Sequence, residues 1–169
     1  MKNLFLVLIL VKSLVALESD LPFNLKIVYG VPLDPTADHF VSTQLDYTFE
    51  LFEESDLYIG AYAAFGDVSY TIESFHLFEG GVMANYDLFP ILRLNYSYGI
   101  IYIGTTEGRT ESAGINLHFE VSERRGWDKF FFDLLGVERS GIGIEYKRLT
   151  FANTIPNSEL ISISWGIMF

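Results

Sequence analysis

The sequence predicts an all-β fold, an eight-stranded antiparallel up-and-down barrel that crosses a membrane with its strands. Three observations indicate this fold. Apolar and polar residues alternate with a period of two through most of the chain, as in strands with one apolar and one polar face. Hydrophobic residues make up 50% of the sequence, yet beyond the N-terminus no apolar run is long enough for a membrane-spanning helix. Eight candidate strands are present, and eight is the smallest common number in such barrels.

A secretory signal peptide is predicted at residues 1–16, MKNLFLVLILVKSLVA. A basic start precedes the apolar run from Leu4 to Val11, and small residues stand near Ala16, which is typical of a cleaved export signal. The apolar run is too short to span a bilayer as a helix. Because no linker divides the remainder, residues 17–169 are expected to form a single barrel domain.

The alternation is clear in the segment HFVSTQLDYTFELFEE, where Val41, Leu45 and Phe49 share one face and Gln44 and Asp46 share the other. Strands of this length suit a tilted crossing of a bilayer. The expected strands are residues 24–31, 39–52, 56–66, 74–87, 91–104, 111–122, 139–151 and 159–169.

The closing segment indicates which face meets lipid. Ile161, Ile163 and Trp165 alternate with Ser162 and Ser164, so bulky residues share one face and small polar residues the other. Aromatic residues near strand ends, opposite a small or charged face, favour a membrane barrel that is apolar outside and polar inside. A soluble, exported lipocalin-like barrel with an apolar interior is the alternative. With eight strands the interior is just filled by side chains, so a conducting pore is not expected.

The connections are expected to alternate between the two ends of the barrel. With both termini at the periplasmic end, the turns EESD and NYDLFP and the segment 123–138 lie there, while VPLDPTAD, residues 67–73, TTEGRT and ANTIPNS face outward. The segment RRGWDKFFFDLLGV has aromatic and apolar residues at helical spacings, which predicts a short amphipathic helix near residues 127–135 or a broken strand.

Composition excludes several classes of function. A formal net charge of −11 argues against nucleic acid as a partner. The absence of cysteine excludes a disulfide scaffold and thiol chemistry. His39, His76 and His118 are far apart without ligand spacing, so neither a metal site nor a cofactor is expected.

Charged residues in the strands predict a polar network inside the barrel, because small barrels fill their interiors with side chains. The expected members are Asp46, Glu50, Glu73, Glu79, Glu145 and Lys147.

The chain ends on Phe169 after a run of alternating apolar residues. This ending resembles the signal by which bacterial outer-membrane barrels are recognised for insertion, and it implies the barrel assembly machinery as a partner. Together with the export signal and the alternating strands, it predicts a location in the bacterial outer membrane.

The second half of the chain resembles the lipid A 3-O-deacylase family of outer-membrane barrels, also called acyloxyacyl hydrolase-like proteins. The resemblance covers roughly residues 75–169, from FHLFEGGVMANYDLFPILRLNYSYGIIYIG through SAGINLHFEV to GIGIEYKRLTFANTIPNSELISISWGIMF. It implies a His-x-Ser-Asn-Ala strand, a Pro-Asn loop and a Glu at the start of the last strand. In that family the His, Ser and Glu form a catalytic triad on the outer wall, which cuts an ester-linked acyl chain of lipid A.

This chain keeps the spacing of the motif but has different residues at its reactive positions. The family's His, Ser, Asn, Ala, Pro-Asn and Glu correspond here to Arg148, Thr150, Phe151, Ala152, Pro156-Asn157 and Glu159. A hydroxyl nucleophile needs a base to take its proton, and arginine is effectively always protonated. Thr150, Glu159 and Arg148 therefore form a degenerate triad, which lacks the histidine base that a lipid A ester hydrolase of this family uses.

Binding is the alternative use of the same residues. Arginine pairs bidentately with phosphate, so Arg148, with Asn153 and Asn157 beside it, is expected to bind lipid A in the outer leaflet. A cross-strand ion pair between Arg148 and Glu159 that only closes the barrel is the second interpretation. A structural or loop-presenting outer-membrane barrel without enzymatic activity is the third.

Overall fold

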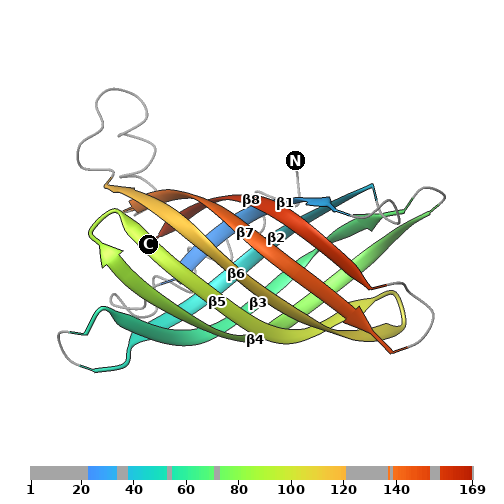
Figure 1. The fold of residues 1–169 in the computed structure, drawn as a ribbon, viewed down its shortest axis with the longest axis horizontal. Helices are drawn as coiled ribbons and strands as arrows, with labels where there is room; N and C mark the ends of the chain where they lie inside the picture. Colours follow the sequence, from blue (N-terminus) through green and yellow to red (C-terminus); the bar gives the residue numbers. More distant parts are fainter. Residues whose placement is uncertain are drawn as a thin grey trace.

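The computed structural model describes residues 23–33, 38–52, 55–70, 73–120, 137, 139–152 and 157–168, which form a closed barrel of eight strands (Figure 1). The predicted fold class is confirmed. The strands are β1 (Phe23–Pro32), β2 (His39–Glu50), β3 (Leu57–Ser69), β4 (Ser74–Phe89), β5 (Leu92–Ile103), β6 (Thr106–Glu120), β7 (Arg139–Phe151) and β8 (Ser158–Met168).

Every strand pairs antiparallel with its neighbour in the sequence, and β1 closes the barrel on β8. The closing ladder runs from Asn24 opposite Met168 to Pro32 opposite Leu160. We call the end with the start of β1 and the end of β8 the N/C end, and the opposite end, on the right of Figure 1, the far end. Closure leaves no free sheet edge, which is what a strand-built membrane protein requires.

Three expected connections are shorter in the structure, and the strands beside them are longer. TTEGRT was expected to be a loop, but β6 begins at Thr106, and Gly104 makes the turn with a φ of 58°. NYDLFP was expected to be a turn, but β4 runs to Phe89 and β5 starts at Leu92. Likewise, β3 continues to Ser69 within the expected loop 67–73. These segments carry charged or aromatic residues on the outer face. The alternation of apolar and polar residues that identifies a strand is therefore weak at these strand ends.

The two faces of the barrel have the chemistry expected of a protein in lipid. The outer wall exposes large apolar side chains, for example Val82 at 63%, Phe65 at 61% and Ile163 at 56%. Many polar and charged side chains are buried in the interior instead, including Lys26, Asp46 and Glu79. This inverted distribution contradicts the soluble lipocalin-like alternative, which needs an apolar interior throughout. In the part of the chain that the structure describes, no helix is long and apolar enough to cross a membrane.

The interior is divided into two layers. At the far end, nine buried apolar residues form a cluster against which Tyr70 and Phe75 pack. This apolar plug consists of Val28, Phe40, Val68, Leu77, Ile101, Ile103, Leu149, Phe151 and Leu160. Towards the N/C end the interior is polar. The plug therefore fills the far end of the barrel lumen with apolar side chains.

The polar layer contains short ion pairs with added hydrogen bonds. Lys147 Nζ lies 2.7 Å from Glu79 Oε2, and the Tyr62 hydroxyl donates to Glu79 Oε1 at 2.8 Å. Lys26 Nζ lies 2.8 Å from Asp46 Oδ2. The expected network thus includes Asp46, Glu79, Glu145 and Lys147, all buried. Glu50 and Glu73, expected in the same network, are exposed near strand ends.

Several predictions fall on residues outside the described ranges. They are the signal peptide at 1–16, the short helix near 127–135, the Pro of the Pro-Asn pair, the lipid-binding residue Asn153 and the terminal residue Phe169.

Candidate functional site

Charged side chains gather on the outer wall where β6, β7 and β8 reach the far end. On β7, Arg148 stands directly opposite Glu111 of β6 and Glu159 of β8, so the three form one row across three strands. In the same way Thr150 stands opposite Arg109. We call this group the charged patch: Glu107, Arg109, Glu111, Arg148, Thr150 and Glu159, all outward-facing. The patch adjoins the apolar outer wall, where Tyr146 and Ile161 are exposed beside it.

The ion pair within the patch is long and open to the surroundings. Arg148 Nε lies 3.9 Å from Glu159 Oε1, and the two side chains are 57% and 50% exposed. The predicted contact between these residues is therefore present. A pair of this geometry contributes only about 0 to 1 kcal/mol. Its main consequence is to hold an arginine and a carboxylate beside each other on the lipid-facing wall.

Two tyrosines of β5 fix the carboxylates of β6. The Tyr96 hydroxyl donates to Glu111 Oε1 at 2.7 Å, and the Tyr102 hydroxyl donates to Glu107 Oε2 at 3.3 Å. Tyrosine carries an apolar ring and a polar tip, which suits the boundary between acyl chains and headgroups. These contacts orient the carboxylates of β6 towards β5.

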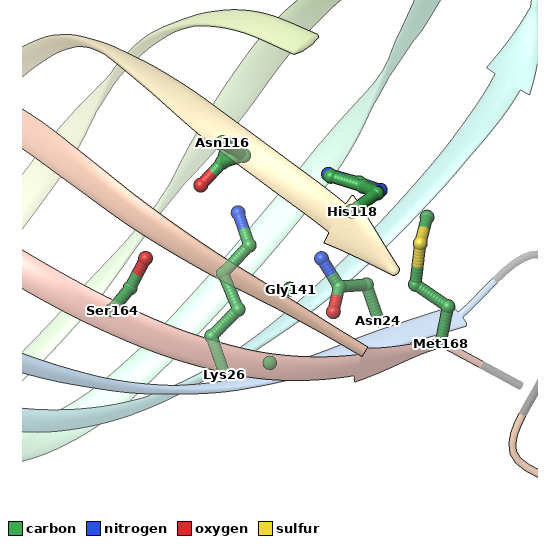
Figure 2. A pocket seen from close by; sticks show the side chains of 8 residues that line it. Asn24, Lys26, Asn116, His118, Gly141, Ser164 and Met168 are labelled. Carbon is green, nitrogen blue, oxygen red and sulfur yellow. The ribbon is translucent and has the colours of Figure 1, made fainter. Parts of the chain in front are cut away.

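Thr150 has an arginine, not a histidine, as its register partner. His118, on β6, is buried in the interior near the N/C end, where it lines a small cavity (Figure 2). His76 is on β4, three strands away, and its Nδ1 lies 2.6 Å from Asp67 Oδ1. Within the described ranges, the outer wall beside Thr150 thus has arginines and carboxylates but no imidazole to serve as a base.

Asn157 has a structural contact in the hairpin between β7 and β8. Its side-chain oxygen accepts a hydrogen bond of 2.8 Å from the Phe151 backbone N–H. This contact ties the start of β8 to the end of β7, directly beyond Thr150. The Asn157 carbonyl is therefore committed to the chain, and only its amide group remains as a donor for a headgroup.

The interior cavity of Figure 2 is too small for a lipid or metabolite. Side chains from β1, β6 and β8, with Gly141 of β7, surround about 10 Å³ of space, which is room for roughly one water molecule. Its lining residues are Asn24, Lys26, Asn116, His118, Gly141, Ser164, Gly166 and Met168. A ligand larger than water therefore does not fit in this cavity.

The sequence predicts the β7 and β8 residues of the charged patch but not those of β6. Arg148, Thr150 and Glu159 were expected on the outer wall, whereas Glu107, Arg109 and Glu111 were placed in or next to a loop. Their odd numbering indicates their orientation, because residues 107, 109 and 111 continue the outward-facing series of Ile115, Leu117 and Phe119.

Solved structures share the fold of this chain. The N-terminal barrel domain of OprF from Pseudomonas aeruginosa matches with a TM-score of 0.57 and 9% identity, over 88% of this chain and 97% of that one. Neisserial surface protein A matches with a TM-score of 0.53 and 14% identity, over 88% and 94%. The outer membrane enzyme PagL matches with a TM-score of 0.50 and 10% identity, over 86% and 98%. No family model matches the chain, and a search of curated proteins finds no match.

By its fold and by the chemistry of its two faces, the chain is a small outer-membrane β-barrel. At these identities the likeness concerns the fold. The activity has to be inferred from the charged patch itself.

Proposed function

We propose that this barrel binds the phosphorylated headgroup of lipid A in the outer leaflet through Arg109 and Arg148, without cleaving it. The observation that carries the proposal is the outward-facing charged row Glu111, Arg148 and Glu159, with Arg109 in the next row. Charged side chains on a lipid-facing wall are costly unless they meet headgroups or water. A phosphate beside Arg148 gives the guanidinium a stronger partner than its 3.9 Å contact with Glu159.

The contacts of Arg148 favour exchange with a phosphate. Its contact with Glu159 is 3.9 Å long and half exposed, so little free energy is lost when the guanidinium turns to a stronger partner. A phosphate offers bidentate, charge-assisted hydrogen bonds to arginine. The neighbouring carboxylates then restrict binding to headgroups that also present hydroxyl or amide donors, as sugars do. A phosphorylated sugar therefore fits the patch better than a bare anion.

Hydrolysis is disfavoured by the residue types at the motif positions. Arg148 cannot accept a proton from Thr150 because its guanidinium stays charged. Arg109, opposite Thr150 on β6, has the same limitation. A carboxylate such as Glu159 is the remaining candidate base, and it stands opposite Arg148, two residues before Thr150 on β7. We therefore assign the patch to binding.

Lipid A binding to the purified protein tests this function. We expect Arg148→Ala and Arg109→Ala each to weaken binding by about tenfold, the effect of losing one charge-assisted contact of ~1.4 kcal/mol. Arg139→Ala is the matched control, because Arg139 is on the same strand at the N/C end and has the same 3.9 Å contact, with Glu120. Equal affinity of all three variants and the native protein would refute the proposal and leave a purely structural barrel.

Mass spectrometry of lipid A from cells that express the protein tests the enzymatic alternative. Our proposal predicts an unchanged acyl chain count. Loss of one acyl chain, abolished by Thr150→Ala, would show instead that the degenerate triad retains ester hydrolysis.

A further inference from the structure

We propose that a groove on the outer wall of β2 to β5 binds one acyl chain of a phospholipid whose headgroup ends in an ammonium group, as in phosphatidylethanolamine. The groove has a volume of about 620 Å³, which lies in the range of ~300 to 1,000 Å³ of ligand pockets. Its lining residues are Tyr47, Phe49, Ile59, Gly60, Ala61, Val82, Met83, Ala84, Tyr96 and Tyr98. The groove lies on other strands than the charged patch, which it meets at the hydrogen bond from Tyr96 to Glu111, and lipid binding in the groove does not require lipid A binding by the patch.

Small residues make the floor of the groove and aromatic residues make its sides. Ala61 of β3 is in register with Val82 of β4, and Ala84 lies two residues further along β4. On one side stand Tyr47 and Phe49 of β2, and on the other side Tyr96 and Tyr98 of β5. The lowered wall over β3 and β4, between the aromatic ridges of β2 and β5, is a furrow that runs along these strands, a shape suited to a flexible chain.

Both ridges are held in place without a ligand. The ring of Tyr47 lies 5.5 Å from that of Phe23 and 6.2 Å from that of Phe49, measured between centroids. On the other ridge, the Tyr96 hydroxyl donates to Glu111 at 2.7 Å. A groove with fixed sides avoids most of the ordering cost of binding. It is therefore a preformed site and not a gap between mobile side chains.

The shape favours a lipid over a second copy of the barrel. A twofold dimer brings the same patch of both subunits together. A concave groove facing its own copy would leave a void between the two walls, whereas an acyl chain fills the concavity. Because the lining is apolar apart from the tyrosine hydroxyls, the matching part of the lipid is its hydrocarbon chain.

The charge at the nearby rim selects the headgroup. The groove reaches the N/C end at Phe49 and Ile59, and the exposed carboxylates of Glu50 and Asp56 lie just beyond them. In the described part of β2 to β5 the sole Arg or Lys side chain is Arg93, which is buried and donates to Asp87 at 2.8 Å. An acidic rim attracts an ammonium headgroup and repels a lipid with net negative charge. This end is also the one predicted to face the periplasm.

Native mass spectrometry of the full chain, released from membranes of defined composition, tests the site. From an equimolar mixture of phosphatidylethanolamine and phosphatidylglycerol, we expect the native protein to retain one phosphatidylethanolamine. Ala61→Phe or Ala84→Phe fills the groove and should lower retention about tenfold. Ile144→Phe is the control, because Ile144 is exposed on the outer wall of β7, away from the four strands that line the groove.

Each alternative outcome overturns the proposal in a recognisable way. Equal retention of both phospholipids would refute the headgroup selection. Retention unaffected by both groove variants would place the lipid elsewhere. A lipid-free dimer that is lost in the groove variants would assign the surface to a second copy. Circular dichroism of every variant verifies the barrel fold, and lipid A binding, measured separately, should be unchanged in Ala61→Phe.

Discussion

Two consecutive residues of β7 show how the side of the barrel decides the energetic role of a charge. Lys147 faces the interior, is 3% exposed and lies 2.7 Å from the fully buried Glu79. Arg148 faces outward, is 57% exposed and lies 3.9 Å from Glu159. Removing one member of a buried pair leaves the other charge without compensation, whereas removing one member of an exposed pair changes little. Lys147 therefore contributes to stability, and Arg148 is available for binding.

We expect Lys147→Met to lower the free energy of unfolding by ~3 to 5 kcal/mol and Arg148→Met to lower it by less than ~1 kcal/mol. Urea unfolding in detergent micelles measures both. Adding Glu79→Gln to Lys147→Met removes the uncompensated charge and should restore much of the loss. Equal stability of the two single variants would contradict this assignment of roles.

Gly99 gives the Tyr62 hydroxyl room to reach Glu79. A Cβ atom at Gly99 would lie 2.6 Å from that hydroxyl oxygen and 2.5 Å from the Gly80 carbonyl oxygen, whereas the nearest atom to a Cβ at Gly80 would be 3.6 Å away. We expect Gly99→Ala to destabilise the barrel by ~1 to 3 kcal/mol through overpacking. Gly80→Ala is the control and should be near neutral in the same urea experiment.

At the scale of elements, the sequence was sufficient for strand number and order but not for strand ends. Alternating residues such as Ile161, Ser162 and Ile163 reveal β8 because its outer face is apolar. The start of β6 shows no such contrast, because Glu107, Arg109 and Glu111 face outward and Gly108 and Thr110 face inward. The outward-facing charges of the candidate site are the reason why the sequence predicts a loop at the start of β6. The two carboxylates that tyrosines bind could not be found without the register of β5 and β6.

The apolar plug makes a further prediction at this scale. Phe40 and Leu160 both approach Gly30 inside the far end, and the ring of Phe40 also covers the Lys147 ammonium at 5.0 Å. We expect the native barrel to be non-conducting in planar bilayers, and Phe40→Ser with Leu160→Ser to introduce ion conductance by letting water into the far end. Ile144→Ser, on the outer wall, is the control. A native protein that conducts as well as the double variant would show that the plug does not seal the lumen.

At the scale of the whole molecule, the inverted distribution of polarity unites these observations. Water is excluded from the apolar belt of the outer wall, so exposed charges lie towards the two ends of the barrel, as Arg148 and Glu159 do at the far end and Glu120 and Arg139 do at the N/C end. Charges inside the barrel have partners on neighbouring or facing strands, as Lys26 of β1 has Asp46 of β2 and Lys147 of β7 has Glu79 of β4. The family resemblance points to Arg148, Thr150 and Glu159, which lie on the outer wall at the far end. It did not determine their chemistry, because residue types and not the fold decide whether a site cleaves or binds.

A depth profile along β8 tests the membrane barrel and the headgroup position of the charged patch together. The sequence contains no cysteine, so single cysteines at positions 159 to 165 can be labelled with a fluorophore and quenched by nitroxide lipids. We predict strong quenching by acyl-chain nitroxides at positions 161, 163 and 165, weak quenching at the buried positions 160, 162 and 164, and quenching of position 159 mainly by headgroup nitroxides. Quenching without a period of two, or a position 159 as deep as position 163, would contradict the account.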